Sequence, residues 1–459
     1  MGMVGGVART PAVGTFAGGV AMQLVNAITS RVKLPIVPRG DVFEPRGTDA
    51  QAGAALVDRL LGALGFISPP VDARTTLGPL LGTTRVMADG STSVRVSFTA
   101  AAPGSSWAVK GRESAVVAVY VDGTYHSDVM VMRERPGSYA VNVGQLAAGA
   151  HRIELRSGAS RAAAGSGTVM VGNVGARRMS RAQTEIDRHA PILQLRDALR
   201  AGGTAESSHT DTPLLVVPSV RQNANGTRTI SYHVLFSNED GGTATPTLFS
   251  KYGRGTDYEL AYSVTLDKAG KRIASKYQGP MHRNYAFTGR YEGDRPVLRV
   301  ATANNNFSQV THAGAARWSE APQSAVSPTT TDTQVMHRHP WTFGVMAAEL
   351  LREGRATTAA VPGLSQVGDP RRYLYVSPAG TPSGVSAAAR GARQLVLILK
   401  GGKRIVLNAT VAGLAAGRST AIMLPSAAFA DAVVGVAGLA NGVAHVLGTT
   451  FAPRRLRAA

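Results

Sequence analysis

The chain has 459 residues, of which 44% are hydrophobic and 17% charged, and it carries a formal net charge of +20 and no cysteine. This length exceeds what one ordinary hydrophobic core organises, and the hydrophobic share excludes a largely disordered chain, so about two to four globular domains are expected. The lack of cysteine excludes disulfides, thiolate nucleophiles and sulfur ligands for metals.

Residues 1–80 are expected to form a lead-in segment. Residues 1–30 combine a basic residue, small residues and one modest apolar run, as a degenerate export signal does. The run 49–66 spaces Leu56, Leu60 and Leu64 at helical intervals, which predicts a short amphipathic helix. No stretch reaches about eighteen uninterrupted apolar residues, so no spanning helix is expected. We therefore expect a secreted or cell-surface protein.

Residues 84–175 have the pattern of an antiparallel β-sandwich. Short runs of alternating apolar and polar residues recur about every eight to twelve residues. The dipeptides Asp122-Gly123 and Pro136-Gly137 are suited to the turns between such strands. The pattern predicts an accessory sandwich domain, of a kind that binds sugars or supports its neighbour.

The same period-two alternation predicts a second sandwich over residues 185–335, as in Ile230, Tyr232 and Val234. Residues 339–459 are expected to form a helix followed by a small β-rich C-terminal region. The predicted fold class is therefore mainly β, with tandem antiparallel β-sandwich domains and a few short helices.

The positive charge indicates an anionic partner. Lysine supplies only eight of the 49 basic residues, so arginine dominates, which genomic composition alone also explains. Because no run of five basic residues exists and the arginines are scattered, a dedicated nucleic-acid surface is not expected. Arginine binds carboxylate and sulfate groups through paired hydrogen bonds, so we expect an anionic polysaccharide or cell-surface glycan. The sequence does not indicate an oligomeric state.

The common catalytic motifs of zinc proteases, serine hydrolases and nucleotide-binding enzymes are missing from the sequence. His337 and His339 would share one face of an extended strand and could then hold a metal ion. They also stand directly before a proline-started helix, where a histidine can simply cap or pack. Both interpretations stay open on the sequence.

The strongest candidate site is the acid, amide and glycine-rich sequence between residues 237 and 259. Asp257 and Glu259 would share one face of a strand, and a buried unpaired carboxylate is costly, so both are either solvated or bound to something. Asp240, Asp257 and Glu259 are predicted metal ligands, and the other predicted ligand-binding residues are Asn238, Glu239, Arg254, Asn304 and Asn305. Asn, Asp and Gly are also ordinary turn formers, so plain turn chemistry is the alternative.

The order of HAPIL (189–193), TDTPLL (210–215), GRGTDYE (253–259) and VLRVATANNNFS (297–308) resembles β-sandwich families around the vacuolar-protein-sorting-like domain. It more remotely resembles the necrosis- and ethylene-inducing-like proteins, over about residues 188–312. The resemblance implies a divalent cation held against sugar headgroups, with Asp257-Tyr258-Glu259 in place of Asp-Trp-Glu. Gly255 and Thr256 stand where those proteins have histidines, so any ion here is expected to be calcium or magnesium.

Two functions follow from these features. The first is a binding protein whose sandwich domains hold carbohydrate or an anionic surface, with a calcium-type cation. The second is a hydrolase or lyase acting on an anionic polysaccharide, with Asp257, Glu259 and His282 as candidate proton-transfer groups. Convergence of these side chains on one groove would favour the enzyme, and scattered outward positions would favour the binding protein.

Overall fold

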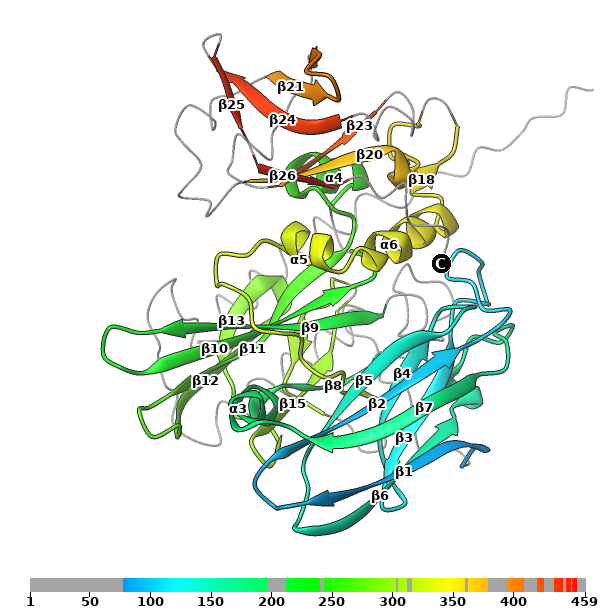
Figure 1. Cartoon of the computed structure of the whole chain (residues 1–459), viewed down its shortest axis with the longest axis vertical. Helices are drawn as coiled ribbons and strands as arrows, with labels where there is room; N and C mark the ends of the chain where they lie inside the picture. Colours follow the sequence, from blue (N-terminus) through cyan, green and yellow to red (C-terminus); the bar gives the residue numbers. More distant parts are fainter. Residues whose placement is uncertain are drawn as a thin grey trace, which may run out of the picture.

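The computed structural model describes residues 77–195, 212–239, 243–302, 304–311, 316–359, 362–378, 394–407, 419–424, 433–440, 443–446 and 448–451. The expected lead-in helix and export segment lie outside the described residues, and so does Asp240. The described residues form several β-sheets with short helices between them, so the mainly β class is confirmed (Figure 1).

The first unit is a sandwich of two antiparallel sheets. One sheet has the order β1 (Leu80–Ala88), β6 (Gly149–Ser157), β3 (Ala115–Val121) and β4 (Thr124–Val131). The facing sheet has the order β5 (Gly137–Gln145), β2 (Ser93–Ala101) and β7 (Met170–Arg178). Alternating side chains from both sheets, among them Val94, Phe98, Val117 and Leu155, form its core.

The first sheet of this sandwich continues into the middle of the chain. Strand β17 (Arg317–Trp318) lies beside β4 in parallel, through the pair Trp318 and Asp128. Beyond β17 follow β8 (Ile192–Gln194), β15 (Arg295–Val300) and β14 (Tyr291–Glu292), and β16 (Phe307–Ser308) also pairs with β15. The two predicted sandwich regions therefore share one nine-stranded sheet.

The middle region also contains a five-stranded antiparallel sheet. Its order is β13 (Arg283–Ala286), β12 (Arg272–Gly279), β11 (Asp257–Leu266), β10 (Arg228–Phe236) and β9 (Pro213–Gln222). Its buried face carries Tyr232, Tyr262 and Phe236, and Phe236 meets Phe307 of β16 with ring centroids 6.2 Å apart. This core fixes one end of the sheet against the Asn304–Asn306 turn.

Short helices join and cover these sheets. They are α3 (Arg181–His189), α4 (Thr245–Tyr252), α5 (Asp332–Arg338) and α6 (Trp341–Arg352), with 3₁₀ turns η1 (Ala159–Arg161), η2 (Pro280–His282) and η3 (Pro370–Arg372). Helix α4 was not expected: Pro246 stands in its first turn and Gly253, with φ 69°, ends it. His337 lies in α5 and His339 is its C-cap, so the extended arrangement considered for this pair is wrong.

The C-terminal part adds small sheets, which Figure 1 places beside α4. They comprise β18 (Ala356–Thr357) with β19 (Val367–Gly368), then β23 (Thr420–Met423), β20 (Tyr373–Pro378) and β26 (Gly448–Phe451), and finally β22 (Arg404–Leu407), β21 (Gln394–Leu399), β24 (Val433–Ala440) and β25 (Val443–Val446). A turn at Gly401-Gly402 joins β21 to β22, with positive φ at both glycines.

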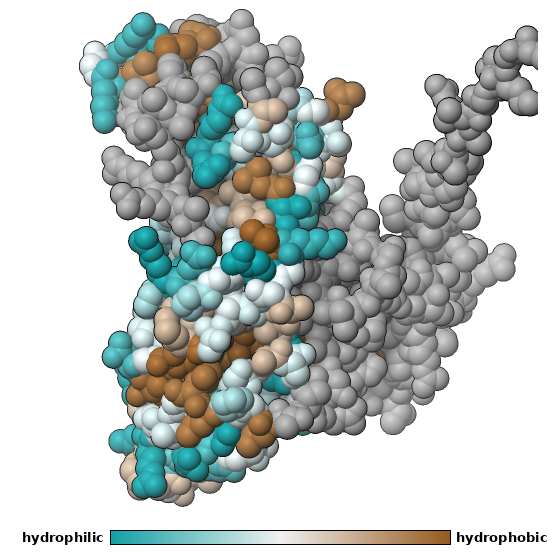
Figure 2. Space-filling model, turned by 90° about the vertical axis from the view of Figure 1, so that its right-hand side faces the viewer, coloured by the Kyte–Doolittle hydropathy of each residue, from teal (hydrophilic) through white to brown (hydrophobic). Residues whose placement is uncertain are grey.

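The sandwich exposes some apolar surface. Figure 2 shows brown side chains gathered on the lower half of one face, at the height where Figure 1 draws the sandwich. Leu80 and Met87 of β1 and Met170 of β7 are exposed large apolar residues of this unit. No helix among the described residues has the length and apolar character needed to cross a membrane.

Candidate functional site

The predicted site residues meet at one end of the five-stranded sheet. Strand β10 ends at Phe236, which pairs with Asp257 at the start of β11, so the segment after β10 and the start of β11 lie together. Asp257 and Glu259 are both buried and share one face of β11, as the sequence predicted. Gln278 near the end of β12 and His282 of η2 reach the same place.

Arg254 is the buried centre of the cluster. Its guanidinium donates to Glu239 at 3.1 Å, to Asp332 at the start of α5, and to the backbone oxygen of Thr256. Burial by itself lowers the pKa of Arg254, but the carboxylates of Asp332 and Glu239 outweigh it and raise that pKa. Arg254 is therefore a structural cation that holds acidic side chains together.

The carboxyl groups outnumber the cations around them. Burial, and then repulsion from Glu259 and Glu239, raises the pKa of Asp257 well above its usual value. Burial also raises the pKa of Glu239, against the opposing attraction of Arg254. Such an excess of buried negative charge needs a proton or a cation to neutralise it.

His282 is the exposed member of the cluster, with 57% of its side chain accessible. Its Nδ1 lies 3.3 Å from the carboxylate of Glu259 and 3.0 Å from the amide of Gln278, which itself contacts Glu259. Its Nε2 lies 3.1 Å from the amide nitrogen of Asn304. The hydrogen bond to Glu259 raises the pKa of His282, with burial acting in the opposite direction.

The backbone here is strained. Met281, His282 and Asn305 have φ values of 59°, 56° and 50°, in the left-handed region that disfavours residues with a Cβ. Each such residue costs on the order of 1–3 kcal/mol and persists only where the surroundings enforce it, commonly at functional sites. The Phe236 and Phe307 core and the Glu259 contact hold this geometry.

Three oxygen atoms of the cluster lack a donor. Oδ2 of Asp257, Oδ1 of Asn304 and Oδ1 of Asn305 are buried and accept no hydrogen bond from the described residues. All three are acceptors, so the cluster needs donors or positive charge. Asn238 differs from these residues because its side chain donates a hydrogen bond to Glu353 and accepts one from Arg355. Its role in the cluster is therefore structural support.

Only two of the three metal ligands predicted from the sequence lie within the described residues. Asp257 and Glu259 lie together, whereas Asp240 lies outside the described residues. Within the described ranges, no three His, Cys, Asp or Glu side chains are arranged to hold a metal ion. Carboxylate and amide oxygens of this kind suit calcium better than zinc.

Sequence reasoning missed Gln278, Asp332 and Asn306, whose amide nitrogen lies 3.5 Å from Nδ1 of His282. Asp332 is 78 positions from Arg254, and nothing in either local sequence indicates the pairing. A signal was available for Asn306, because it belongs to the same three-asparagine run as the predicted Asn304 and Asn305.

The fold and the cluster define a mainly β protein with a buried carboxylate and amide centre and one exposed histidine. No protein-family model matches the sequence, and no curated protein matches it. The resemblance to vacuolar-protein-sorting-like and necrosis-inducing-like domains therefore stays a prediction.

Solved structures give only low similarity. The EclA C-terminal domain, a sugar-binding protein, is 10% identical with a TM-score of 0.17, over 32% of this chain and 90% of that one. The N-terminal CBM22 tandem domain of Paenibacillus barcinonensis Xyn10C is 13% identical with a TM-score of 0.17, over 56% and 86%. A family two carbohydrate esterase from Clostridium thermocellum is 15% identical with a TM-score of 0.15, over 25% and 32%. Scores of this size establish no shared fold or function.

Proposed function

We propose that this chain binds carbohydrate, through the cluster at the end of the five-stranded sheet. The observation that supports this most directly is the convergence of Glu259, Gln278 and Asn304 on the exposed imidazole of His282. Together these groups offer donors and acceptors, which a ligand rich in hydroxyl groups requires. The strained backbone around His282 fits a pre-organised contact surface better than a plain turn.

The proposal includes the setting and the partner. With a net charge of +20, the protein would meet an anionic glycan outside the cell or at its surface, where opposite charges speed association. A calcium-type cation at Asp257 and Glu259 would supply the positive charge that this buried acidic cluster needs, and it would let sugar hydroxyls bind beside carboxylates.

The test is binding to uronate-containing, sulfated and neutral polysaccharides at near-physiological salt, in calcium and in chelator. We expect one acidic glycan to bind preferentially, and His282→Ala to weaken that binding about tenfold, equivalent to ~1.4 kcal/mol. His151→Ala is the matched control, because His151 pairs with Asp122 at a distant hairpin of the sandwich. Equal, salt-labile binding to every polyanion, unaffected by His282→Ala, would refute the proposal.

An enzyme is the second candidate, favoured by the contact between Glu259 and the exposed His282. A buried carboxylate that orients an accessible imidazole is a recurrent arrangement for proton transfer. The same incubations distinguish the enzyme from the binding protein. Shortening of the polysaccharide by wild type but not by His282→Ala would identify a hydrolase or lyase. Binding with no shortening leaves a binding protein.

A further inference from the structure

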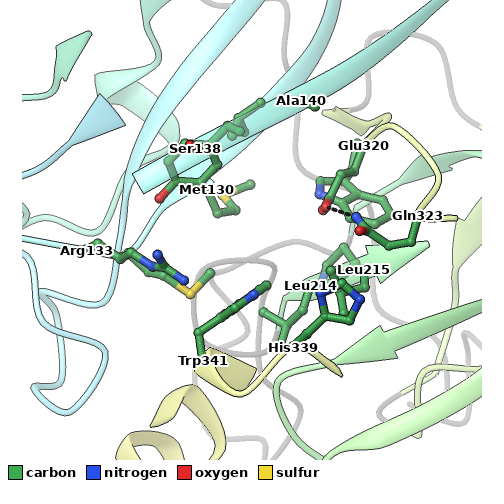
Figure 3. Close-up of a pocket in the computed structure, with 15 residues that line it drawn as sticks. Met130, Arg133, Ser138, Ala140, Leu214, Leu215, Glu320, Gln323, His339 and Trp341 are labelled. Carbon is green, nitrogen blue, oxygen red and sulfur yellow. Dashed lines mark hydrogen bonds between the residues drawn. The ribbon is translucent and has the colours of Figure 1, made fainter. Parts of the chain in front are cut away.

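A cavity lies between the sandwich and the five-stranded sheet. This cavity of about 370 Å³ is at the lower end of the range of roughly 300–1,000 Å³ for small-molecule sites. Its walls come from the end of β4 and from β5 on one side, and from β9, β17 and the corner between α5 and α6 on the other (Figure 3).

Aromatic rings provide the apolar part of the lining. Trp318 of β17 and Trp341 at the start of α6 both line the cavity, together with Tyr139 of β5. Trp318 and Trp341 are two of the three tryptophans of the chain. Trp318 is only 3% accessible and Tyr139 is stacked on Phe98, so the partly buried Trp341 offers the flat face that can bind the apolar CH face of a sugar ring and leave its hydroxyls free for polar groups.

Arg133 supplies a positive charge to the cavity and has no counter-ion among the described residues. Its guanidinium lies 5.0 Å from the ring centroid of Trp341, and Figure 3 shows the two side chains next to each other at one side of the space. Among the described residues no carboxylate forms an ion pair with Arg133, whereas the buried Arg161 and Arg254 are paired with acids. A carboxylate of a ligand could therefore bind Arg133 through two parallel hydrogen bonds.

Glu320 and Gln323 supply polar groups on the opposite side. Gln323 donates to Glu320 at 3.4 Å, and Figure 3 draws this pair across the cavity from Arg133. Burial raises the pKa of Glu320 well above its usual value, which favours the protonated form, and a protonated acid can donate as well as accept. A neutral acid, an amide and His339 nearby are suited to hydroxyl groups.

We propose that this cavity binds a hexuronate residue of an acidic glycan, with its carboxylate on Arg133 and its ring against Trp341. The inference rests on the proposed function and adds a second contact to it. Phe236 pairs with Pro213 of β9 and with Asp257 of β11, so the cavity and the His282 cluster lie at the same end of one sheet. Two strand spacings, about 10 Å, separate β9 from β11.

The experiment titrates the full chain with mannuronate, galacturonate and glucuronate trisaccharides and with their carboxyl-reduced, neutral counterparts, following tryptophan fluorescence and calorimetric heat. We expect at least one trisaccharide to change the fluorescence and to bind at least about tenfold more tightly than its neutral counterpart. Arg133→Ala should weaken that binding about tenfold or more, and Arg133→Lys less, because lysine keeps the charge but loses the paired geometry. Trp341→Phe should bind more tightly than Trp341→Ala.

Arg135→Ala is the matched control, since it removes the same charge from an exposed position two residues away. Melting curves of every variant establish that it is folded. Binding by Arg133→Ala that equals wild type, or an equal loss in Arg135→Ala, would overturn the cavity assignment. If His282→Ala alone loses binding, the proposed function stands without this site. If wild type binds no saccharide, both proposals fail.

Discussion

At the scale of single residues, Asp257 is the most informative side chain. Its accessible surface is 1%, Oδ2 has no hydrogen-bond donor among the described residues, and Glu259 and Glu239 stand nearby. In the absence of a cation, its raised pKa means that the folded protein holds a proton that the unfolded chain releases at lower pH. Linkage then makes the folded state lose stability as pH rises from the ordinary Asp value through the raised value.

We expect Asp257→Asn to remove this dependence in the presence of chelator. The amide has nearly the same shape and no charge, so the variant should exceed wild type in stability at neutral pH by about 1–3 kcal/mol, and differ less below pH 4. Thermal or denaturant unfolding across pH measures it. Glu134→Gln, at an exposed acid, is the control. A wild-type advantage that grows with pH would contradict the assignment.

At the scale of elements, α5 links the cluster to the helices. Thr331 forms a capping box with Gln334, in which the Thr331 side chain accepts from the Gln334 backbone and the Gln334 side chain accepts from the Thr331 backbone. Asp332, which follows Thr331 in the chain, accepts a hydrogen bond from Arg254. The backbone at Asp332 must therefore be held in place for this contact to form. The cap that starts this short helix thus also positions an acid of the cluster.

Thr331→Ala should lower the free energy of unfolding by about 1 kcal/mol, because the backbone N–H of Gln334 loses the Thr331 hydroxyl that accepts from it. For a cooperative unit of about 150–250 residues, that shifts the melting temperature by roughly 2–4 °C. Thermal melting is the measurement, with Thr330→Ala as the neighbouring control. We also expect the pH dependence assigned to Asp257 to change, since Asp332 would hold Arg254 less firmly. Equal melting of the two variants would show that the cap does not stabilise α5.

At the scale of the whole molecule, the sandwich and the middle region are joined by buried polar contacts. Arg95 of β2 forms a bidentate ion pair with Asp187 of α3 at 2.7 and 2.5 Å. Trp107 donates to Glu349 of α6 at 2.8 Å. Arg295 of β15 donates to backbone oxygens of Ala190 and Asn142 and to Ser319, and burial lowers the pKa of Arg295 to about 10.

We expect Arg295→Met to lower the stability of both regions together, by several kcal/mol, because three buried acceptors lose one donor group at about 1–3 kcal/mol each. Differential scanning calorimetry should show one transition moved to lower temperature. Arg290→Met is the control, since Arg290 is largely exposed and its pair with Glu292 contributes at most about 1 kcal/mol. A separate sandwich transition that does not move would instead support the independent domain expected from the sequence.

The sequence by itself determined the strands and the loops that carry the acidic residues. Period-two alternation placed Ile230, Tyr232 and Val234 on a strand, and put Asp257 and Glu259 on one face of the next. Turn residues such as Asp122-Gly123 marked hairpins because their left-handed backbone is favoured by few residue types. These are local preferences, and they act over a few neighbouring residues.

Tertiary structure alone decided which distant residues meet. Arg254 donates a hydrogen bond to Asp332, and Arg133 lies over the ring of Trp341. Trp318 pairs with Asp128 at the edge of the sandwich sheet. The segment TPTLFSKY forms helix α4, and His337 lies in helix α5, and neither was expected from the local sequence. The physical reason is that periodicity encodes which side of an element is buried, but not which element covers it. That choice depends on packing across the whole core, so the candidate cluster could be predicted in part and the cavity not at all.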